Sequence, residues 1–338
     1  MDLADRIVMK DWCLFTGSAH PALAKRIAAR AGLPFGRVEV ERFPDGEIRP
    51  RVQGSLKGRG AIIVQPTCPP VNDHLVELIL SIDSLLDAGA QKVVTVVPYF
   101  GYARQCKRDG PGDPLSAKVI AQLIEKVGAD AIVVLDIHDP TVLERIKIPF
   151  VHVRAEEIMA RVIRARFPPE SNLAIVAPDG GGAERAQRVA NLLGLPAVAL
   201  EKKRDRLGSR ACAGVQHCSV DLLEGKSAVI VDDMVTTGST LVAAVHALRR
   251  EGADLVGAVC THGVLSPEAI RRLEEAHLPW LAVSDSLPVL SPPLFLQQFS
   301  VAPLLAKAVV KVARRVAGER PSRRLPESDG HNSTTLFG

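Results

Sequence analysis

Short, continuously apolar runs separated by helical segments constrain this sequence more than any other feature. A half-exposed strand alternates apolar and polar side chains, whereas a parallel strand covered by helices on both faces is apolar throughout. Residues 73–88 repeat apolar side chains at helical spacing, and Gly89 follows them as a typical residue beyond a helix C-terminus. The pattern predicts an α/β fold with a mainly parallel sheet flanked by helices. The six apolar runs are 61–64, 92–97, 131–135, 173–177, 227–231 and 255–259.

The length of the chain and a weak internal repeat indicate two domains. The chain has 338 residues, and a domain has roughly 150. Residues 61–97 and 228–259 both run from strand through turn and helix to strand, either because all such units look alike or because the chain holds two copies of one domain. We expect an N-terminal domain at 1–152, a C-terminal domain at 153–318 and a disordered tail at 319–338, which has no apolar period.

Composition excludes several classes of protein. Lys and Arg number 42 and Asp and Glu 38, giving a net charge of +4, and aromatic residues make up 4%. These values argue against a nucleic-acid or membrane-surface binder. The sequence has neither an apolar run of spanning length nor the apolar core of a signal peptide at its start. The six cysteines show no C-x-x-C spacing, so we expect reduced thiols and a cytoplasmic protein.

The strongest chemical motif lies at residues 229–240, Val-Ile-Val-Asp-Asp-Met-Val-Thr-Thr-Gly-Ser-Thr. Asp232 and Asp233 end an apolar run, and α/β proteins bind ligands at the carboxyl ends of parallel strands. The segment 236–240 supplies hydroxyls and backbone N–H groups at a predicted helix N-terminus, which suits a phosphate. A simple helix cap with solvated acids is the alternative. Two acids followed by a small polar loop favour a phosphorylated sugar.

Three other segments have both a chemical and a structural interpretation. Residues 98–105 gather both tyrosines of the chain beside Arg104 and Gln105, which suits a planar base bearing phosphates or an ordinary packed turn. His138 and Asp179 follow apolar runs, where a ligand site or plain structural roles are both open. The charged run 201–206 is typical of a solvated surface, but a basic loop of this kind also suits closure over phosphates.

The motif at 229–240 resembles the phosphoribosyl-diphosphate (PRPP) binding motif of type I phosphoribosyltransferases and of the ribose-phosphate diphosphokinase (PRPP synthetase) family. Further landmarks resemble the latter family, in its order, over residues 12 to 315, and plain phosphoribosyltransferases lack the first half. The resemblance implies two tandem type I phosphoribosyltransferase-like domains. The landmarks are Phe43-Pro-Asp-Gly-Glu47, Gln65-Pro-Thr67, Pro70-Val-Asn-Asp73, Pro98-Tyr-Phe-Gly-Tyr-Ala-Arg-Gln105, Pro114-Leu-Ser-Ala-Lys118, Asp136-Ile-His138 and Pro178-Asp-Gly-Gly181.

The resemblance also implies an activity and a set of site residues. The family transfers the β,γ-diphosphoryl group of Mg-ATP to the 1-hydroxyl of ribose 5-phosphate, giving PRPP and AMP. The implied cofactor is Mg²⁺, held by His138 and Asp179, and the implied catalytic pair is Lys202 and Arg204. The ATP site is shared between subunits of a homo-oligomer. The implied ATP-binding residues are Phe43, Asp45, Glu47, Arg104 and Gln105, and those for ribose 5-phosphate are Asp232, Asp233, Thr236, Thr237, Gly238, Ser239 and Thr240.

Two positions depart from the family pattern. Cys106 stands where an acidic residue is more usual, and Thr236 stands where many bacterial members have Asp. These departures bear on allosteric control more than on the reaction. A non-catalytic regulatory subunit and a PRPP-consuming phosphoribosyltransferase are the alternatives. The first should have lost basic residues of 202–206 or acids of 232–233, and the second does not need the segment from Phe43 to Gln105.

Overall fold

Five parallel strands form the first sheet of the chain. A computed structural model describes residues 9–108, 110–202, 215–216, 223 and 225–318. Every residue of the three central strands is buried, as their apolar runs predict. In spatial order the strands are β1 (Trp12–Thr16), β4 (Gly60–Val64), β5 (Lys92–Val97), β6 (Ala131–Leu135) and β7 (Phe150–Val153). The helices between them are α2 (Pro21–Ala31), α3 (Val71–Asp87), α4 (Ser116–Val127) and the 3₁₀ helix η1 (Pro140–Arg145).

The second sheet has six parallel strands and repeats this design. In spatial order they are β15 (Leu296–Phe299), β14 (Leu281–Ser284), β13 (Val256–Gly263), β12 (Ser227–Val235), β8 (Leu173–Ala177) and β9 (Ala197–Ala199). Its helices are α5 (Glu156–Arg166), η2 (Gly180–Gly182), α6 (Ala183–Leu193), α7 (Ser239–Arg250) and α8 (Pro267–Glu275). The expected α/β class, with mainly parallel sheets between helices, is therefore confirmed.

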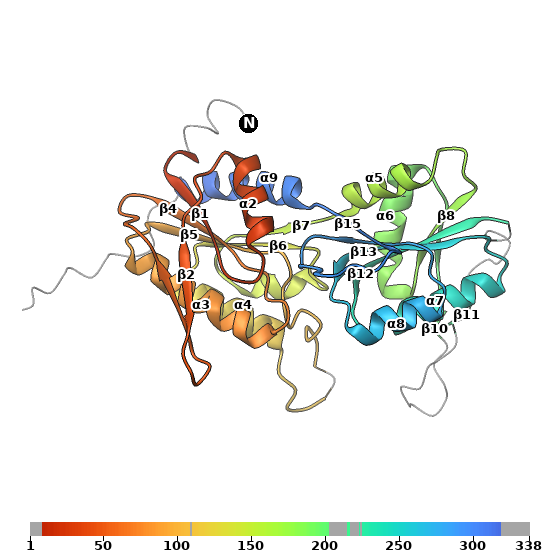
Figure 1. Cartoon of the computed structure of the whole chain (residues 1–338), viewed down its shortest axis with the longest axis horizontal. Coiled ribbons are helices and arrows are strands. Elements are labelled where there is room, and N and C mark those ends of the chain that lie inside the picture. Colours follow the sequence, from red (N-terminus) through yellow and green to blue (C-terminus); the bar gives the residue numbers. More distant parts are fainter. Residues whose placement is uncertain (1–8, 109, 203–214, 217–222, 224, 319–338) are drawn as a thin grey trace, which may run out of the picture.

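Figure 1 shows the two sheets side by side, with helices above and below them. Helices α2, α5, α6 and α9 (Ala302–Ala317) lie on one side, and one continuous apolar core joins their inner faces. Helices α3 and α4 cover the other face of the first sheet, and α7 and α8 that of the second. Helix α9 packs against α2 and the first sheet, although the whole second sheet precedes it in sequence. The division of the chain at residues 152 and 153 stays a prediction.

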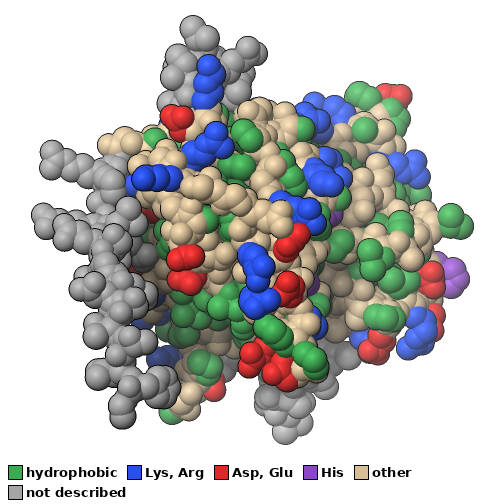
Figure 2. Space-filling model, turned by 60° about the vertical axis from the view of Figure 1, so that its left-hand side comes forward, with side chains coloured by type: hydrophobic (Ala, Val, Ile, Leu, Met, Phe, Trp, Pro, Cys, Tyr) green, Lys and Arg blue, Asp and Glu red, His purple; other side chains and the backbone are tan. Residues whose placement is uncertain are grey.

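Two antiparallel ribbons lie outside the sheets. The first is the hairpin of β2 (Val38–Arg42) and β3 (Ile48–Val52), and the second pairs β10 (Glu201–Lys202) with β11 (Val215–Gln216). In sequence, the first ribbon directly precedes β4 and the second directly precedes β12. Charges of both signs lie among apolar side chains on the face drawn in Figure 2, in keeping with the balanced composition. No helix in the described part of the chain is long and apolar enough to span a membrane.

Candidate active site

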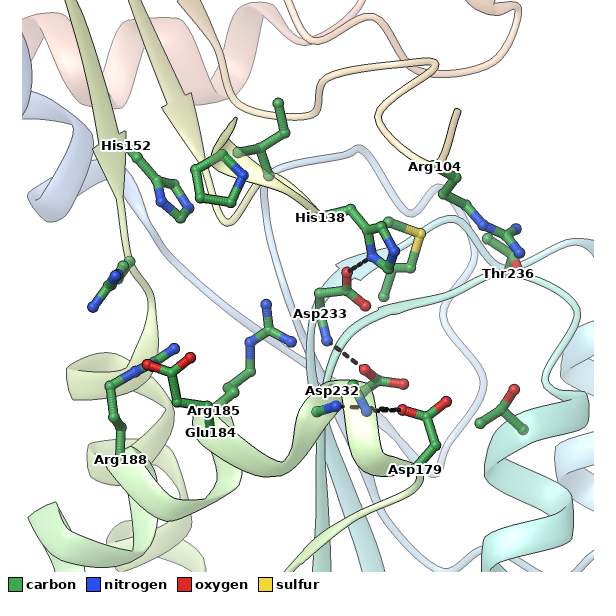
Figure 3. A pocket seen from close by; sticks show the side chains of 17 residues that line it. Arg104, His138, His152, Asp179, Glu184, Arg185, Arg188, Asp232, Asp233 and Thr236 are labelled. Carbon is green, nitrogen blue, oxygen red and sulfur yellow. Dashed lines mark hydrogen bonds and ion pairs between the residues drawn. The ribbon is translucent and has the colours of Figure 1, made fainter. Parts of the chain in front are cut away.

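A pocket of about 340 Å³ lies between the two domains. The first domain contributes Arg104 and His138, and the second contributes side chains from the ends of β8 and β12 (Figure 3). The pocket therefore brings together seven of the predicted site residues at the carboxyl ends of strands, where α/β proteins bind ligands. These are Arg104, His138, Asp179, Asp232, Asp233, Thr236 and Thr240.

The pKa values of the two acids near the end of β12 are shifted in opposite directions. Burial and the neighbouring charge of Asp233 raise the pKa of Asp232. Burial also acts to raise the pKa of Asp233, but the hydrogen bond to His138 and the positive charge of Arg185 outweigh it and lower that pKa. Two adjacent carboxylates cannot both ionise cheaply in a buried site. Asp233 therefore carries the charge, and Asp232 holds a proton more readily than a free aspartate.

His138 joins the domains at the centre of this pocket. Its Nδ1 lies 2.7 Å from Oδ2 of Asp233, although 95 residues separate the two in sequence. The hydrogen bond to Asp233 raises the pKa of His138, and burial opposes this only in part. The lone histidine that sequence patterns left open as structural or functional thus lies in the pocket and is paired with an acid.

The glycine run after β8 is held by the acid before it. The Asp179 carboxylate accepts hydrogen bonds from the N–H groups of Gly181 and Gly182, at 3.1 and 3.3 Å. Both glycines line the pocket beside Asp179. This backbone without Cβ atoms lets a ligand approach closely, as the sequence pattern predicted.

Four arginines surround the acids, and sequence patterns identified only Arg104. Arg185 and Arg188 lie on α6, where they read as ordinary charges of an amphipathic helix, and Arg154 follows β7. Nε of Arg185 is buried and has no hydrogen-bond partner among the residues that the structure describes. Arg188 pairs with Glu156 at 2.8 Å and with Glu184 at 2.5 Å. A buried guanidinium nitrogen without a partner beside a pocket favours an anionic ligand.

A second pocket of about 520 Å³ shares Arg104 and Met234 with the first. Its lining includes Tyr99, Phe100, Tyr102 and Gln105, so the cluster of aromatic side chains around 98–105 does form one wall. The Gln105 side chain accepts a hydrogen bond from Ser116 Oγ at 2.6 Å. The two pockets are therefore adjacent, with Arg104 and Met234 lining both.

The loop between β12 and α7 presents small polar groups. Gly238 has φ 74°, the left-handed region that favours glycine, and its turn leads directly into α7. Thr237 Oγ1 lies 3.1 Å from Ser239 Oγ. Thr236 and Thr240 line the pocket itself, while Thr237, Gly238 and Ser239 complete the turn beside it.

The remaining predicted ATP-binding residues do not reach either of these pockets within one chain. Phe43 and Asp45 lie at the turn of the β2–β3 hairpin, and Phe43 is 40% exposed. The Arg49 guanidinium lies 5.1 Å from the centre of the Phe43 ring. Glu47 lines a separate groove on α3. The assignment of these three residues to ATP stays a prediction.

The predicted catalytic pair can be located only in part. The backbone of Lys202 ends β10 and pairs with that of Val215. Arg204 lies outside the described residues, as does the predicted tail at 319–338. The catalytic role of both side chains stays a prediction.

The pocket offers oxygen donors for a cation without forming a complete protein cage. Asp179, Asp232 and Asp233 line it, but the described residues contain no cluster of three or more His, Cys, Asp or Glu side chains arranged to hold a metal. Mg²⁺ prefers oxygen ligands and usually keeps waters or takes substrate phosphate oxygens. These residues therefore fit a magnesium ion whose coordination is completed by phosphates and water.

Comparisons with known proteins agree with this geometry. Residues 12–128 match the N-terminal domain of ribose phosphate pyrophosphokinase, and residues 146–276 match the phosphoribosyl transferase domain. The chain is 34% identical to the ribose-phosphate pyrophosphokinase of Helicobacter pylori over 304 residues, covering 90% of this chain and 94% of that protein. It is 38% identical to that of Maricaulis maris over 305 residues, covering 89% and 96%.

A solved structure extends the match to three dimensions. The crystal structure of phosphoribosylpyrophosphate synthetase from Mycobacterium smegmatis superposes with a TM-score of 0.83 at 31% identity. The match covers 90% of this chain and 99% of that one. Both domains and the pocket between them therefore belong to the matched region.

Proposed function

This chain belongs to the ribose-phosphate pyrophosphokinase family, and we propose that the pocket between its domains is where the reaction takes place. The enzyme transfers the β,γ-diphosphoryl group of ATP to the 1-hydroxyl of ribose 5-phosphate and forms PRPP and AMP. The observation that supports this site best is the meeting, in one pocket, of Asp232, Asp233 and the loop at 236–240 with four arginines.

The second domain binds the sugar phosphate in this proposal. Asp232 and Asp233 accept hydrogen bonds from the ribose hydroxyls, and the N–H and hydroxyl groups of 236–240 bind the 5-phosphate at the start of α7. The raised pKa of Asp232 and the lowered pKa of Asp233 suit hydroxyls that both donate and accept. The site then holds the 1-hydroxyl near the junction with the first domain.

ATP lies across the two adjacent pockets. Its adenine packs near the aromatic side chains of 98–105, and Arg104 binds its phosphates where the pockets meet. The 1-hydroxyl attacks the β-phosphorus in line, and AMP leaves from the opposite side. Arg104 and Arg185, together with Lys202 and Arg204 of the charged segment, stabilise charge on the phosphate oxygens in the transition state.

Magnesium is the proposed cofactor. His138 and Asp179 would hold it, with phosphate oxygens and water as further ligands, and it would neutralise phosphate charge. The Nδ1 atom of His138 already contacts Asp233, which leaves Nε2 as the ring nitrogen for a ligand.

A homo-oligomer completes the ATP site. Phe43, Asp45 and Glu47 lie on the β2–β3 hairpin and line neither of the two adjacent pockets of their own chain. Large apolar side chains near the hairpin and on α3 and α4 are exposed, which supports contact with a second copy. These are Phe43, Val76, Leu80, Val119 and Leu123.

Free thiols at Cys13, Cys68, Cys106 and Cys260 support location in a reducing compartment, the cytoplasm.

One assay tests the reaction directly. The protein is incubated with ribose 5-phosphate, ATP and Mg²⁺, and the products are separated. Equal amounts of AMP and PRPP are expected. ADP as the product would contradict diphosphoryl transfer, and binding of both substrates without turnover would favour the regulatory subunit.

A further inference from the structure

Two adjacent residues of β13 in the second domain bind the end of β6 in the first. Thr261 Oγ1 donates a hydrogen bond to the Asp136 carboxylate, and His262 Nε2 lies 3.1 Å from the carbonyl oxygen of Leu135. Thr261 is fully buried and His262 is 2% exposed. Burying polar groups costs free energy unless each one finds a hydrogen-bond partner, whereas an apolar contact could join the domains without that requirement. These paired polar groups therefore fix one geometry at the junction.

The hydrogen-bond partners of His262 determine which nitrogen carries its proton. The Leu135 carbonyl can only accept, so Nε2 must be the donor. Burial lowers the pKa of His262, which keeps the ring neutral and leaves Nδ1 as an acceptor. Ser286 Oγ lies 2.9 Å from Nδ1, to which its hydroxyl donates in this tautomer, and the carbonyl oxygen of Thr261 is a more distant acceptor at 3.4 Å. Ser286 thus holds the tautomer of His262 that binds the first domain.

Asp136 holds an unusual backbone conformation at the same point. Its φ is 38°, uncommon for a residue other than glycine, and its side chain is 2% exposed. Its second carboxylate oxygen accepts from the Ala155 N–H at 3.2 Å. Such a conformation persists when surrounding contacts enforce it. Here Thr261 supplies one of those contacts from the other domain.

The chain enters the active site two residues later. His138 Nδ1 contacts Asp233 of β12, and β12 is the strand that pairs with β13. The segment from Leu135 to His138 is therefore bound at both ends to neighbouring strands of the second sheet. The Tyr99 ring, from the wall of the second pocket, also packs edge-on against His262 with centroids 5.2 Å apart.

We propose that Thr261 and His262 are positioning residues for diphosphoryl transfer. They set the first domain, with Arg104 and His138, at the distance from the sugar-binding loop that in-line attack requires. The contacts proposed for ribose 5-phosphate all lie in the second domain, and those proposed for the adenine lie in the first, so binding of each substrate alone should change little without them. This inference rests on the proposed reaction site. A small misplacement at a distance from the reacting atoms is enough to reduce a rate by about a hundredfold.

Thr261→Val removes the hydroxyl and keeps the shape of the side chain. We expect kcat to fall about ten- to a hundredfold, while the Kd of ribose 5-phosphate and that of a non-hydrolysable ATP analogue change less than about threefold. Thr261→Ser keeps the hydroxyl and should restore kcat. The matched control is Thr95→Val, since Thr95 is equally buried and donates to Ala131 O at 3.1 Å within the first sheet. It should lose stability but keep kcat.

Ser286→Ala is the second variant, because it perturbs His262 without touching Asp136 and serves if Thr261→Val does not fold. It should lower kcat with both Kd values preserved. Unchanged kcat in the folded variants would overturn the proposal. So would an equal kcat loss in Thr95→Val at a matched loss of melting temperature. Absence of AMP and PRPP with the unmodified enzyme would instead overturn the proposed function, so the two failures are distinguishable.

Discussion

In the first domain the link from β4 to α3, residues 65–70, pairs Gln65 Oε1 and Thr67 Oγ1 with backbone N–H groups, although Gln65 Nε2 has no partner among the described residues. In the second domain the link from β12 to α7 lies beside the pocket instead. Gln65 and Thr67 are buried. Gln65 Oε1 accepts from Ala19 N at 3.2 Å, and Thr67 Oγ1 accepts from Gly101 N at 2.7 Å. Thr236 of the second link and Thr240 of the first turn of α7 line the 340 Å³ pocket instead.

The link from β1 to α2 shows the same difference more strongly. The N–H and Oγ of Ser18 both donate to the buried Glu77 carboxylate at 2.5 Å. A Cβ on Gly17 would lie 2.3 Å from Gln65 Oε1, so no space remains at this strand end. A carboxylate of the chain itself thus satisfies donors of the kind that, in the proposed site of the second domain, bind the 5-phosphate. One arrangement of strands and helices gives either a closed structural end or a binding site.

The two ribbons can be compared in the same way, and the largest effect on kcat is expected in the segment of the β10–β11 ribbon. If the β10–β11 segment acts on the transferring phosphates, Lys202→Ala or Arg204→Ala should lower kcat by about 10²-fold or more, the scale of losing one transition-state donor. KM for ribose 5-phosphate should change little. Steady-state kinetics beside the exposed control Lys126→Ala would check this. An unchanged kcat in both variants would make the segment a solvated surface.

Substitutions in or beside the link from β12 to α7 should weaken the binding of ribose 5-phosphate much more than that of ATP. Asp233→Asn and Ser239→Val each remove an interaction proposed for ribose 5-phosphate, worth roughly 1.5–3 kcal/mol for a charge-assisted hydrogen bond. Its affinity should fall about ten- to a hundredfold, while that of ATP changes much less. Calorimetry with each ligand alone measures both, and Asp254→Asn, an exposed acid before β13, is the control. Loss of ATP binding with normal sugar binding would mean that the two subsites are exchanged.

The closed strand end should affect stability and not activity. Glu77→Gln places an amide N–H₂ group against one of the Ser18 donors and should cost about 1–3 kcal/mol of unfolding free energy. Chemical denaturation should show this loss, with kcat per folded molecule unchanged. The exposed Glu144→Gln should show neither effect. Weakened ribose 5-phosphate binding in Glu77→Gln would show that the end of β1 contributes to substrate binding and is not only structural.

The smallest effect is expected at the ion pair between His138 and Asp233. Because the hydrogen bond to Asp233 raises the pKa of His138, protonated His138 stabilises the fold below its unfolded value of about 6.5, and this is lost as pH rises through the folded pKa. Asp233 has a lowered pKa, so its contribution is present above about 3.8 and is lost as pH falls through its folded value.

Melting temperatures of His138→Gln and the unmodified protein would test this. Their difference should be larger near about pH 5.5 than near about pH 9, and should correspond to less than about 1 kcal/mol because His138 is half exposed. His246→Gln, at an exposed position on α7, is the control. A difference that grows toward alkaline pH would contradict the pairing.

Sequence patterns predicted those features that depend on residues close together in the sequence. Five of the six apolar runs lie wholly in strands, and the run 255–259 begins one residue before β13. The motif at 229–240 forms a strand end, a loop and a helix start. Arg185 and Arg188 were missed because charges on an amphipathic helix look solvated until the facing element is known. The interdomain contacts of Thr261 and His262 were missed for a similar reason, since they fall inside an otherwise ordinary buried strand and their partners lie about 125 residues earlier.

Helix α9 has a consequence for how this protein is made. Its buried face, which includes Leu305, Val309, Val312 and Val316, covers the first sheet and α2, yet it follows every other helix in the described part of the chain. A ribosome that has delivered the whole first sheet still has to synthesise the second before this cover emerges. While the second sheet is being made, the nascent first domain therefore exposes the part of its apolar face that α9 later covers, the kind of surface that chaperones bind.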